Sequence, residues 1–249
     1  MKIFEITLFW ITLAPSYYGL MYILGFLYGL WAIKKTGRYN ENQRELLFFY
    51  IFAGVVFWGR LWYVLFYNFS DFLLSPLDIL KVWQGGMSFH GWFIWVCIAL
   101  IFYARKQNMN LWKLADDIAS IIPVGLFFGR IGNYINKELL GFPYDGFLAV
   151  QTPQGSFFPS PLIEAFLEGV VIYVVLQYIL KRQKFDGQLA SLFFILYWLF
   201  RTFVELFIRT PDIQIWYYFW IFTQGSLLSI PMIWIGMILY SSLWRKKDF

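Results

Sequence analysis

Stretches of about 20 mostly apolar residues recur along the whole chain, and this feature constrains the fold more than any other. Sixty per cent of the 249 residues are hydrophobic and 14 per cent are charged. A water-soluble domain cannot hide so much apolar surface, whereas the bilayer can serve as its solvent. A helix that crosses a bilayer needs roughly 20 apolar residues. The sequence therefore predicts an all-α, polytopic membrane protein with about seven transmembrane helices.

Hydropathy and turn residues divide the chain into seven predicted spans joined by short connections. The predicted spans lie near residues 17–34, 46–67, 88–104, 114–135, 161–180, 188–208 and 219–243. Among the connections that follow the fourth predicted span, the longest contains the insert 141–159. Because no room remains for a large soluble domain, we expect residues 1–249 to form a single membrane domain.

Basic residues are distributed very unevenly among the connections. The first, third and fifth connections and the carboxyl terminus each carry at least three lysines or arginines. The alternate connections carry one basic residue each, which are Lys81, Lys137 and Arg209. The positive-inside rule then places the amino terminus outside and the carboxyl terminus in the cytoplasm, so the insert 141–159 is extracytoplasmic. The net charge of +5 is explained by topology and does not indicate nucleic-acid binding.

The chain contains one cysteine, Cys97, and one histidine, His90. This excludes an internal disulfide, cysteine-based metal clusters and sites that need several histidines. Any catalysis must therefore use carboxylates, arginines, tyrosines, amides or the imidazole of His90. The run GGMSFHGW places glycines on both sides of His90, which indicates that something approaches the backbone there.

Ionisable residues inside the predicted spans are the main functional signal, because each costs at least about 2.5 kcal/mol on insertion scales. Arg60, Arg130, Arg201 and Glu205 lie inside spans. Arg201 and Glu205 are four residues apart, so they can pair on one face of a helix. Arg60, in the run GRLWYVLFYN, is equally compatible with an internal hydrogen-bonding role and with a functional one.

Helical spacing also singles out two further groups of polar residues. On a helix, Arg130, Asn133 and Asn136 share one face, which helix packing alone does not require. Several arginines within a bilayer suggest a lipid phosphate, because the planar guanidinium binds two oxygens at once. Glu164 and Glu168 carry like charges at the same spacing, and they would repel unless each met a donor such as an arginine from another helix. We expect a structural role for these two glutamates.

The run GRIGNYINKELLG resembles the signature of the prolipoprotein diacylglyceryl transferases. Five other runs agree in the family's order: SYYGLMYILGF, GRLWYVLFYN, GGMSFHG, RTFVELFIRTPD and QGSLLSIPM. The resemblance implies a multi-pass enzyme of the bacterial inner membrane that needs no metal or nucleotide cofactor. Such an enzyme transfers the diacylglyceryl group of phosphatidylglycerol to the lipobox cysteine of a prolipoprotein signal peptide and releases glycerol phosphate. Its partners are these two substrates and membrane lipids.

The resemblance also implies roles for individual residues. Arg130 and Arg201 should hold the lipid phosphate, and His90 is the sole candidate for a histidine base; these three are the candidate catalytic residues. Alternatively, the positive electrostatic field of nearby arginines activates the cysteine by lowering the pKa of its thiol. The candidate substrate-binding residues are Tyr18, Arg60, Asn133, Asn136, Glu138, Gly141, Tyr197 and Glu205.

The chain departs from the family pattern at three places. The insert 141–159 is shorter than usual. Phe158 stands where the family commonly has a histidine, and Pro161 replaces a glutamine shortly after it. One extra residue separates Glu205 from Arg209. These departures bear on how the peptide is held and on the role of Arg209.

An alternative to the enzyme is a non-catalytic protein of this family that binds or moves lipid. Such a protein would keep the phosphate site and lose the site for the acceptor peptide, and the short insert is the feature that favours it. A solute transporter has no support, because the sequence shows no convincing internal repeat.

We predict that the connections 34–45, 105–113 and 181–187 face the cytoplasm. In a Cys97→Ser background, the variant Asn40→Cys should resist a membrane-impermeant maleimide in intact cells and react after permeabilisation. The variant Asp145→Cys, in the predicted outer insert, is the matched control and should react from outside. Labelling of position 40 in intact cells would show that the predicted orientation is wrong.

Overall fold

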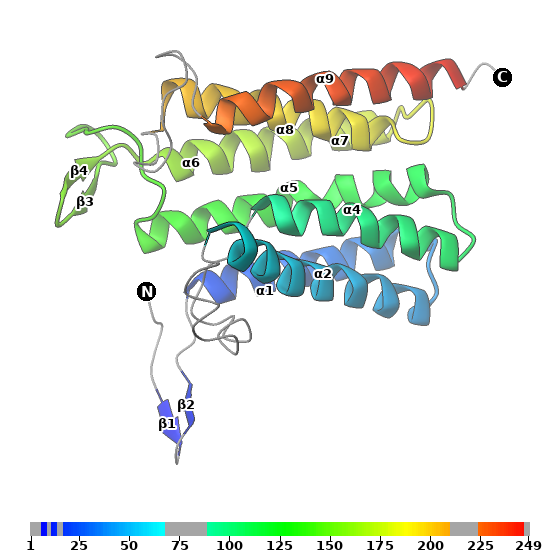
Figure 1. Ribbon diagram of the computed structural model, residues 1–249, viewed down its shortest axis with the longest axis horizontal. Coiled ribbons are helices and arrows are strands. Elements are labelled where there is room, and N and C mark those ends of the chain that lie inside the picture. The colour runs from blue at the N-terminus through cyan, green and yellow to red at the C-terminus, as the bar shows by residue number, and fades with distance from the viewer. Residues whose placement is uncertain (1–5, 9–10, 14–16, 68–88, 210–223, 247–249) are drawn as a thin grey trace. The chain divides into compact units, whose positions relative to one another are not determined.

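The computed structural model describes residues 6–8, 11–13, 17–67, 89–209 and 224–246, and these residues are mostly helical (Figure 1). The chain divides into two compact units. The smaller unit is Ile33–Leu114, and the larger unit consists of Met1–Ala32 and Ala115–Phe249. The candidate site lies within the larger unit.

The smaller unit is built on two helices that pack against each other, α2 (Glu41–Tyr67) and α4 (Phe89–Lys106). Their contact includes the backbone at Gly54. A Cβ atom at this position would lie 1.7 Å from Cδ1 of Trp95, so only a glycine lets the indole ring approach. Close approach at small residues is a common way for membrane helices to associate.

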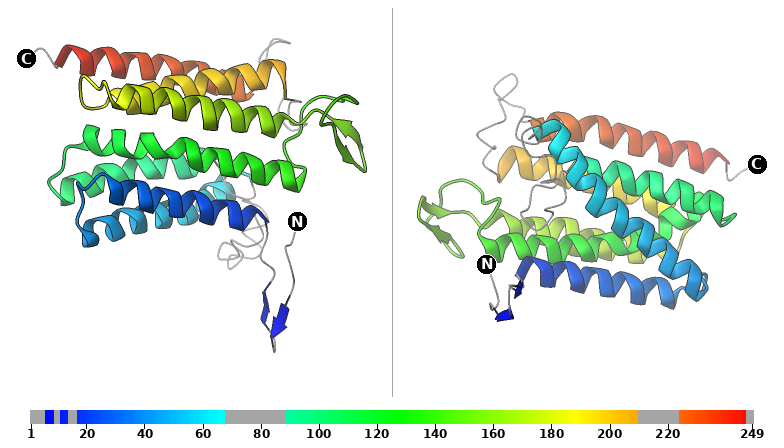
Figure 2. Two further views of the ribbon diagram at one scale, coloured as in Figure 1. Left: turned by 180° about the vertical axis from the view of Figure 1, so that it is seen from behind. Right: turned by 60° about the horizontal axis from the view of Figure 1, so that its bottom comes forward.

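The remaining described helices lie wholly or mainly in the larger unit. They are α1 (Tyr17–Lys35), α5 (Leu111–Asn136), α6 (Ser160–Glu164), the π-helix η3 (Ala165–Val171), α7 (Ile172–Leu180), α8 (Gln188–Phe207) and α9 (Gln224–Arg245). Helices α6, η3 and α7 follow one another without a break and act as one rod. Figures 1 and 2 show this rod beside α8, with α9 running along α8, and α8 and α9 are in extensive contact.

Two short antiparallel hairpins accompany the helices. Strands β1 (Ile6–Leu8) and β2 (Ile11–Leu13) form the first, and β3 (Val150–Thr152) and β4 (Gly155–Phe157) form the second. The second hairpin belongs to the predicted outer insert. It is tied to the end of α5, because Nζ of Lys137 donates to the carbonyl oxygen of Gln151 at 2.7 Å.

The carboxylate of Asp116 joins α5 to the beginning of α8. Asp116 is buried, and its two oxygens accept hydrogen bonds from the backbone nitrogens of Gly187 at 2.7 Å and Ala190 at 2.9 Å. The first backbone N–H groups of a helix have no partner within it, so a carboxylate that meets them stabilises the helix start. Asp116 thereby fixes α8 against α5 at the end remote from Arg201.

The π-helix η3 approaches α5 directly. A Cβ atom at Gly169 would lie 2.6 Å from Cβ and 3.0 Å from Cα of Phe127. Glu168 is the neighbour of Gly169 in η3, and Arg130 lies about one turn after Phe127 in α5. The close approach therefore brings Glu168 and Arg130 to the same level. Single-turn π-helices within longer helices are frequent at functional sites.

A described helix coincides with or overlaps each of the seven predicted spans, although residues 88 and 219–223 lie outside the described part. Within the described residues, three helices are long and apolar enough to cross a membrane, by length and composition: Leu111–Asn136, Ser160–Leu180 and Gln188–Phe207. The helical nature of the chain is thus confirmed. Seven crossings, the orientation of the termini and a single membrane domain over 1–249 stay predictions.

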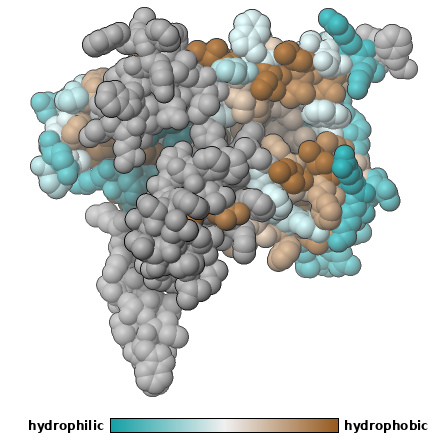
Figure 3. All heavy atoms as spheres, viewed as in Figure 1, coloured by the Kyte–Doolittle hydropathy of each residue, from teal (hydrophilic) through white to brown (hydrophobic). Residues whose placement is uncertain are grey.

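Large apolar side chains are exposed along the helices. Phe49 on α2, Val174 on α7 and Ile238 on α9 are 66, 60 and 61 per cent exposed. Figure 3 shows hydrophobic residues over the helices and hydrophilic residues gathered at helix ends. Apolar surface of this extent would be a liability in water, whereas lipid chains cover it without cost.

We expect Gly169→Ala to destabilise the protein by about 1–3 kcal/mol, because the added methyl group must push η3 away from α5. The measurement is the thermal unfolding midpoint of the purified protein in detergent. The matched control is Gly129→Ala on α5, where an added Cβ meets nothing within 4 Å. Equal midpoints for the two variants would contradict the close contact.

Candidate functional site

Six charged side chains in the larger unit form one continuous set of ion pairs, which we call the arginine–glutamate network. Its members are Arg130 on α5, Glu164 at the end of α6, Glu168 in η3, Arg201 and Glu205 on α8, and Arg209 shortly after α8. Opposite charges alternate along it from Glu168 to Arg209. Three helical segments that are distant in sequence therefore meet through charged groups.

Arg130 connects the two glutamates of the α6–η3 rod. Its Nη2 and Nε atoms lie 2.9 and 3.0 Å from Oε2 of Glu168. Its Nη1 atom lies 2.8 Å from Oε2 of Glu164. All three nitrogens of the guanidinium group are engaged, so its plane and position are fixed by the rod.

Arg201 continues the network onto α8. Its Nη1 atom lies 3.0 Å from Oε2 of Glu164, the same oxygen that Arg130 contacts, and its Nη2 atom pairs with Oε1 of Glu205. That oxygen also accepts from Nη1 of Arg209 at 3.2 Å. The ion pair that helical spacing predicted between Arg201 and Glu205 is present, and Arg209 joins it despite the extra residue.

The carboxylates lie deeper than the guanidinium groups. The side chains of Glu164 and Glu168 are fully buried, whereas those of Arg130 and Arg201 remain 13 and 16 per cent exposed. Both arginines therefore keep part of their side-chain surface accessible, whereas these two glutamates keep none. Three positive and three negative charges give the network a formal charge of zero.

Two buried oxygen atoms in the network lack a hydrogen-bond partner among the described residues. They are Oε1 of Glu164 and Oε1 of Glu168. Among the residues that the structure describes, the other oxygen of each carboxylate is held by arginine. A buried carboxylate that depends on its ion pairs is tolerated only while those pairs persist. The arrangement of Arg130 and Arg201 is thus tightly coupled to these two glutamates.

A second polar group follows Arg130 along α5. The Nδ2 atom of Asn133 donates to Oε2 of Glu138 at 3.2 Å, and that of Asn136 donates to Oε1 at 3.3 Å. Asn133 is buried, and Glu138 lies just after the helix ends. Two amides therefore hold one carboxylate about a turn beyond Arg130. The structure brings these three residues together, whereas the spacing in the sequence had placed only the two asparagines on one helix face with Arg130.

Gly141 connects the insert 141–159 to the network. Its backbone nitrogen donates to the carbonyl oxygen of Phe158 at 2.9 Å, and it forms a bridge with Arg209. A Cβ atom at Gly141 would lie 2.5 Å from the carbonyl oxygen of Ile208. A glycine is needed here because the insert and the end of α8 are in direct backbone contact.

Aromatic rings occupy the same insert. The rings of Phe142 and Phe158 are stacked, with centroids 5.1 Å apart, and Tyr144 meets Phe158 edge-on at 5.2 Å. Phe158, which stands where the family commonly has a histidine, thus packs within the insert. The substitution exchanges a polar ring for an apolar contact.

The remaining candidate residues have different placements. Tyr197 is buried on α8, one turn before Arg201, and its ring stacks on Phe193. Tyr18 is in the first turn of α1, Arg60 is in α2 and His90 is in the first turn of α4. The side chains of the last three lie outside the described part of the structure.

Glu164 and Glu168 are not among the candidate site residues predicted from the sequence. Each meets an arginine from another helix, which was the condition under which two like charges at this spacing could be buried. That condition was the signal in the sequence that could have identified the two glutamates as site residues. It did not say which arginines would supply the charge, because only the fold brings α5 and α8 to this rod.

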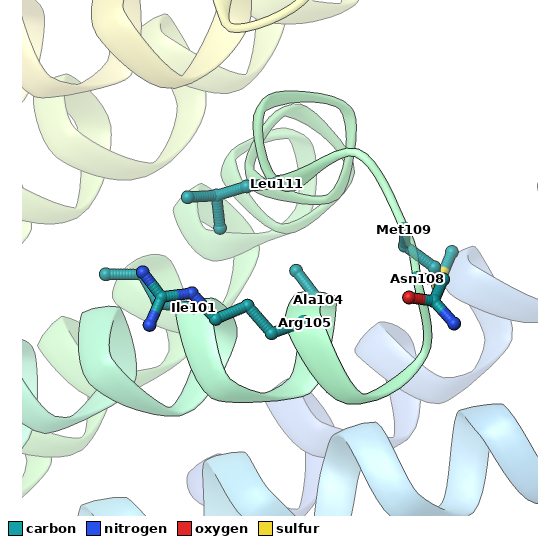
Figure 4. A pocket seen from close by; sticks show the side chains of 6 residues that line it. All are labelled: Ile101, Ala104, Arg105, Asn108, Met109 and Leu111. Atoms are coloured by element: carbon teal, nitrogen blue, oxygen red, sulfur yellow. The ribbon is translucent and has the colours of Figure 1, made fainter.

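A separate hollow of about 460 Å³ lies in the smaller unit, at the turn after α4 (Figure 4). It is lined by Ile101, Ala104, Arg105, Asn108, Met109 and Leu111. Arg105 is its one charged lining residue, and no network residue lines it. The arginine–glutamate network is the stronger candidate, since it presents two guanidinium groups that can bind an oxyanion.

Comparison with known proteins points to one family. The family model described as prolipoprotein diacylglyceryl transferase matches residues 6–242. This range contains every residue of the network and every candidate residue named from the sequence.

Similar proteins from several bacteria agree with the family match. The chain is 40 per cent identical over 242 residues to a protein of Hydrogenovibrio crunogenus, covering 93 per cent of this chain and 91 per cent of that protein. It is 42 per cent identical over 245 residues to one of Pasteurella multocida, covering 93 and 90 per cent. A protein of Methylococcus capsulatus is 40 per cent identical over 248 residues, covering 95 and 94 per cent. All three are named phosphatidylglycerol–prolipoprotein diacylglyceryl transferase.

Proposed function

The chain belongs to the prolipoprotein diacylglyceryl transferase family, and from this we propose how its residues serve the reaction. It is a transferase that moves a diacylglyceryl group from phosphatidylglycerol to a prolipoprotein. The acceptor is the lipobox cysteine thiol, the product is a thioether, and glycerol phosphate leaves. The enzyme works in the bacterial inner membrane, with seven spans, its amino terminus outside and its carboxyl terminus in the cytoplasm.

The arginine–glutamate network is the phosphate site of this reaction. The observation that carries this proposal is the pair of arginines, Arg130 and Arg201, whose side chains are partly exposed and whose guanidinium groups share one oxygen of Glu164. Guanidinium groups match the geometry of a phosphate and stay charged in an apolar environment. The lipid phosphate approaches the exposed edges of the arginines, while the glutamates fix them from behind.

The reaction needs charge stabilisation at this phosphate. The cysteine sulfur forms a bond to the glyceryl carbon, the bond between that carbon and the phosphate oxygen breaks, and its electron pair stays on the oxygen. The thiol proton passes to a base. Because negative charge grows on the leaving phosphate, fixed guanidinium groups lower the barrier. Arg130 and Arg201 supply them.

The thiol can be activated in two ways. A free thiol has a pKa near 8.5 and is only a few per cent ionised at neutral pH. His90 is the candidate base that removes its proton. Alternatively, the positive field of Arg130 and Arg201 lowers the thiol pKa on its own. The two routes differ in what they require of His90, which makes them separable by experiment.

The other polar residues position the two substrates. Asn133, Asn136 and Glu138 form a hydrogen-bonded group beside Arg130 that suits the glycerol headgroup, because amides and carboxylates bind hydroxyl groups. Gly141 and the outer insert contact the backbone at Arg209 and lead from the site to the acceptor peptide. Tyr18, Arg60 and Tyr197 contribute further hydrogen bonds.

Glu205 has a more direct role. It pairs with both Arg201 and Arg209 and so orients Arg201 toward the phosphate.

We expect Arg130→Lys and Arg201→Lys each to lower kcat/KM on the order of 10²-fold, because lysine keeps the charge and loses the two-pronged contact. The measurement is transfer of a diacylglyceryl group to a lipobox peptide, followed by mass spectrometry. Arg105→Lys, an exposed arginine outside the network, is the matched control and should behave as wild type. Near-normal turnover in both network variants would remove the arginines from the phosphate site.

If His90 accepts the thiol proton, His90→Gln should reduce the rate by roughly 10²–10⁴-fold at neutral pH. The defect should shrink as pH rises toward the thiol pKa, since the solvent then supplies the thiolate. The measurement is initial rate against pH for both proteins, with saturating phosphatidylglycerol in detergent. Parallel profiles less than about tenfold apart would exclude the base role and favour activation by the arginines.

A further inference from the structure

The network that binds phosphate in this proposal carries no net charge. Three arginines face three glutamates, and each of these three guanidinium groups already has a carboxylate partner. A site selected only for tight anion binding would leave its arginines unneutralised, because each nearby carboxylate repels the ligand. The zero net charge of the network must therefore be explained by the reaction itself.

Substrate and product of the reaction differ in charge. Phosphatidylglycerol is a phosphate diester and carries one negative charge. When the bond between carbon and oxygen breaks, the glycerol phosphate leaves as a monoester, and the thiol proton goes to a base. A phosphate monoester carries about −1.5 to −2 charges at neutral pH. A site that must bind the diester and then release the monoester therefore needs limited positive charge.

We propose that Glu164 is a positioning residue that sets the charge of the phosphate site, so that the site retains the singly charged diester and releases the doubly charged monoester. The inference rests on the proposed function, since it assumes that Arg130 and Arg201 hold the phosphate. It deepens that function by assigning product release to a particular carboxylate.

Glu164 is the suited residue because of its position. A single oxygen of Glu164 contacts Arg130 at 2.8 Å and Arg201 at 3.0 Å, so it joins arginines from two helices. Glu168 contacts Arg130, and Glu205 contacts residues of α8 and its end. A phosphate that binds both arginines would therefore lie next to the negative charge of Glu164.

Burial makes this charge effective. Glu164 is fully buried, and its second oxygen has no hydrogen-bond partner within the described ranges. Its charge is therefore not dispersed by hydrogen bonds from that side, and water does not screen it well. Repulsion of a bound anion grows in proportion to the anion's own charge. The monoester is repelled about twice as strongly as the diester.

The test is the substitution Glu164→Gln, which keeps the shape of the side chain and removes its charge. Two water-soluble probes are titrated into the purified protein in detergent near pH 7.5. They are glycerophosphoglycerol, a diester, and glycerol phosphate, a monoester. We expect Kd to fall about threefold for the diester and about tenfold for the monoester, because binding energy changes in proportion to ligand charge.

Kinetics provide a second readout. In Glu164→Gln, the KM for phosphatidylglycerol should fall, glycerol phosphate should inhibit more strongly, and kcat should fall because product release becomes slow. A merely structural role would raise KM or leave it unchanged while it lowers kcat. Glu45→Gln, an exposed glutamate of α2, changes the charge of the chain equally and should leave both constants unchanged.

The possible outcomes separate the two proposals. If Arg130→Lys weakens glycerol phosphate binding but Glu164→Gln does not tighten it, the phosphate site stands and the role of Glu164 is wrong. If Arg130→Lys has no effect on this binding, the phosphate site itself is wrong. Should Glu164→Gln fail to fold, Glu168→Gln decides: tighter monoester binding supports the charge balance, and unchanged or weaker binding overturns it.

Discussion

Arginine groups buried among apolar helices must be met by carboxylates, and this requirement organises the larger unit. A charge left alone in such an environment costs several kcal/mol, and the loss is recovered only when partners lie in hydrogen-bonding geometry. Arg130 and Arg201 reach Glu164 from two helices, so α5, the α6–η3–α7 rod and α8 must lie together. The ion pairs thus specify which helices associate, which apolar packing does weakly when lipid surrounds the protein.

Close backbone contacts hold the network at its required geometry. Gly169 lets η3 lie against Phe127 of α5, and Gly141 lets the insert 141–159 touch the end of α8. Asp116 ties α5 to the start of α8 at the other end of these helices. With both ends fixed, the guanidinium groups cannot move apart when a ligand leaves. A preorganised site of this kind loses little energy to rearrangement during the reaction.

Structural and functional roles meet in the same residues. An ion pair that stabilises buried helices and a phosphate site are usually weighed as alternatives for an intramembrane arginine. Here the side chains of Glu164 and Glu168 are fully buried, and those of Arg130 and Arg201 are partly exposed. The carboxylates that make burial possible also determine how strongly the arginines attract an anion. Stability and ligand affinity are therefore linked through Glu164, and neither is set independently.

The sequence by itself determined the helical membrane character and the approximate ends of the helices, and it singled out Arg130, Arg201 and the run after Arg130 as candidate site residues. These follow from local signals, since hydropathy fixes spans and helical spacing fixes which neighbours share a face. The ion pair between Arg201 and Glu205 could be predicted from the sequence for the same reason. Only the tertiary structure decided that Glu164 joins Arg130 to Arg201, because that contact links residues 34 or more positions apart, and no local period encodes it.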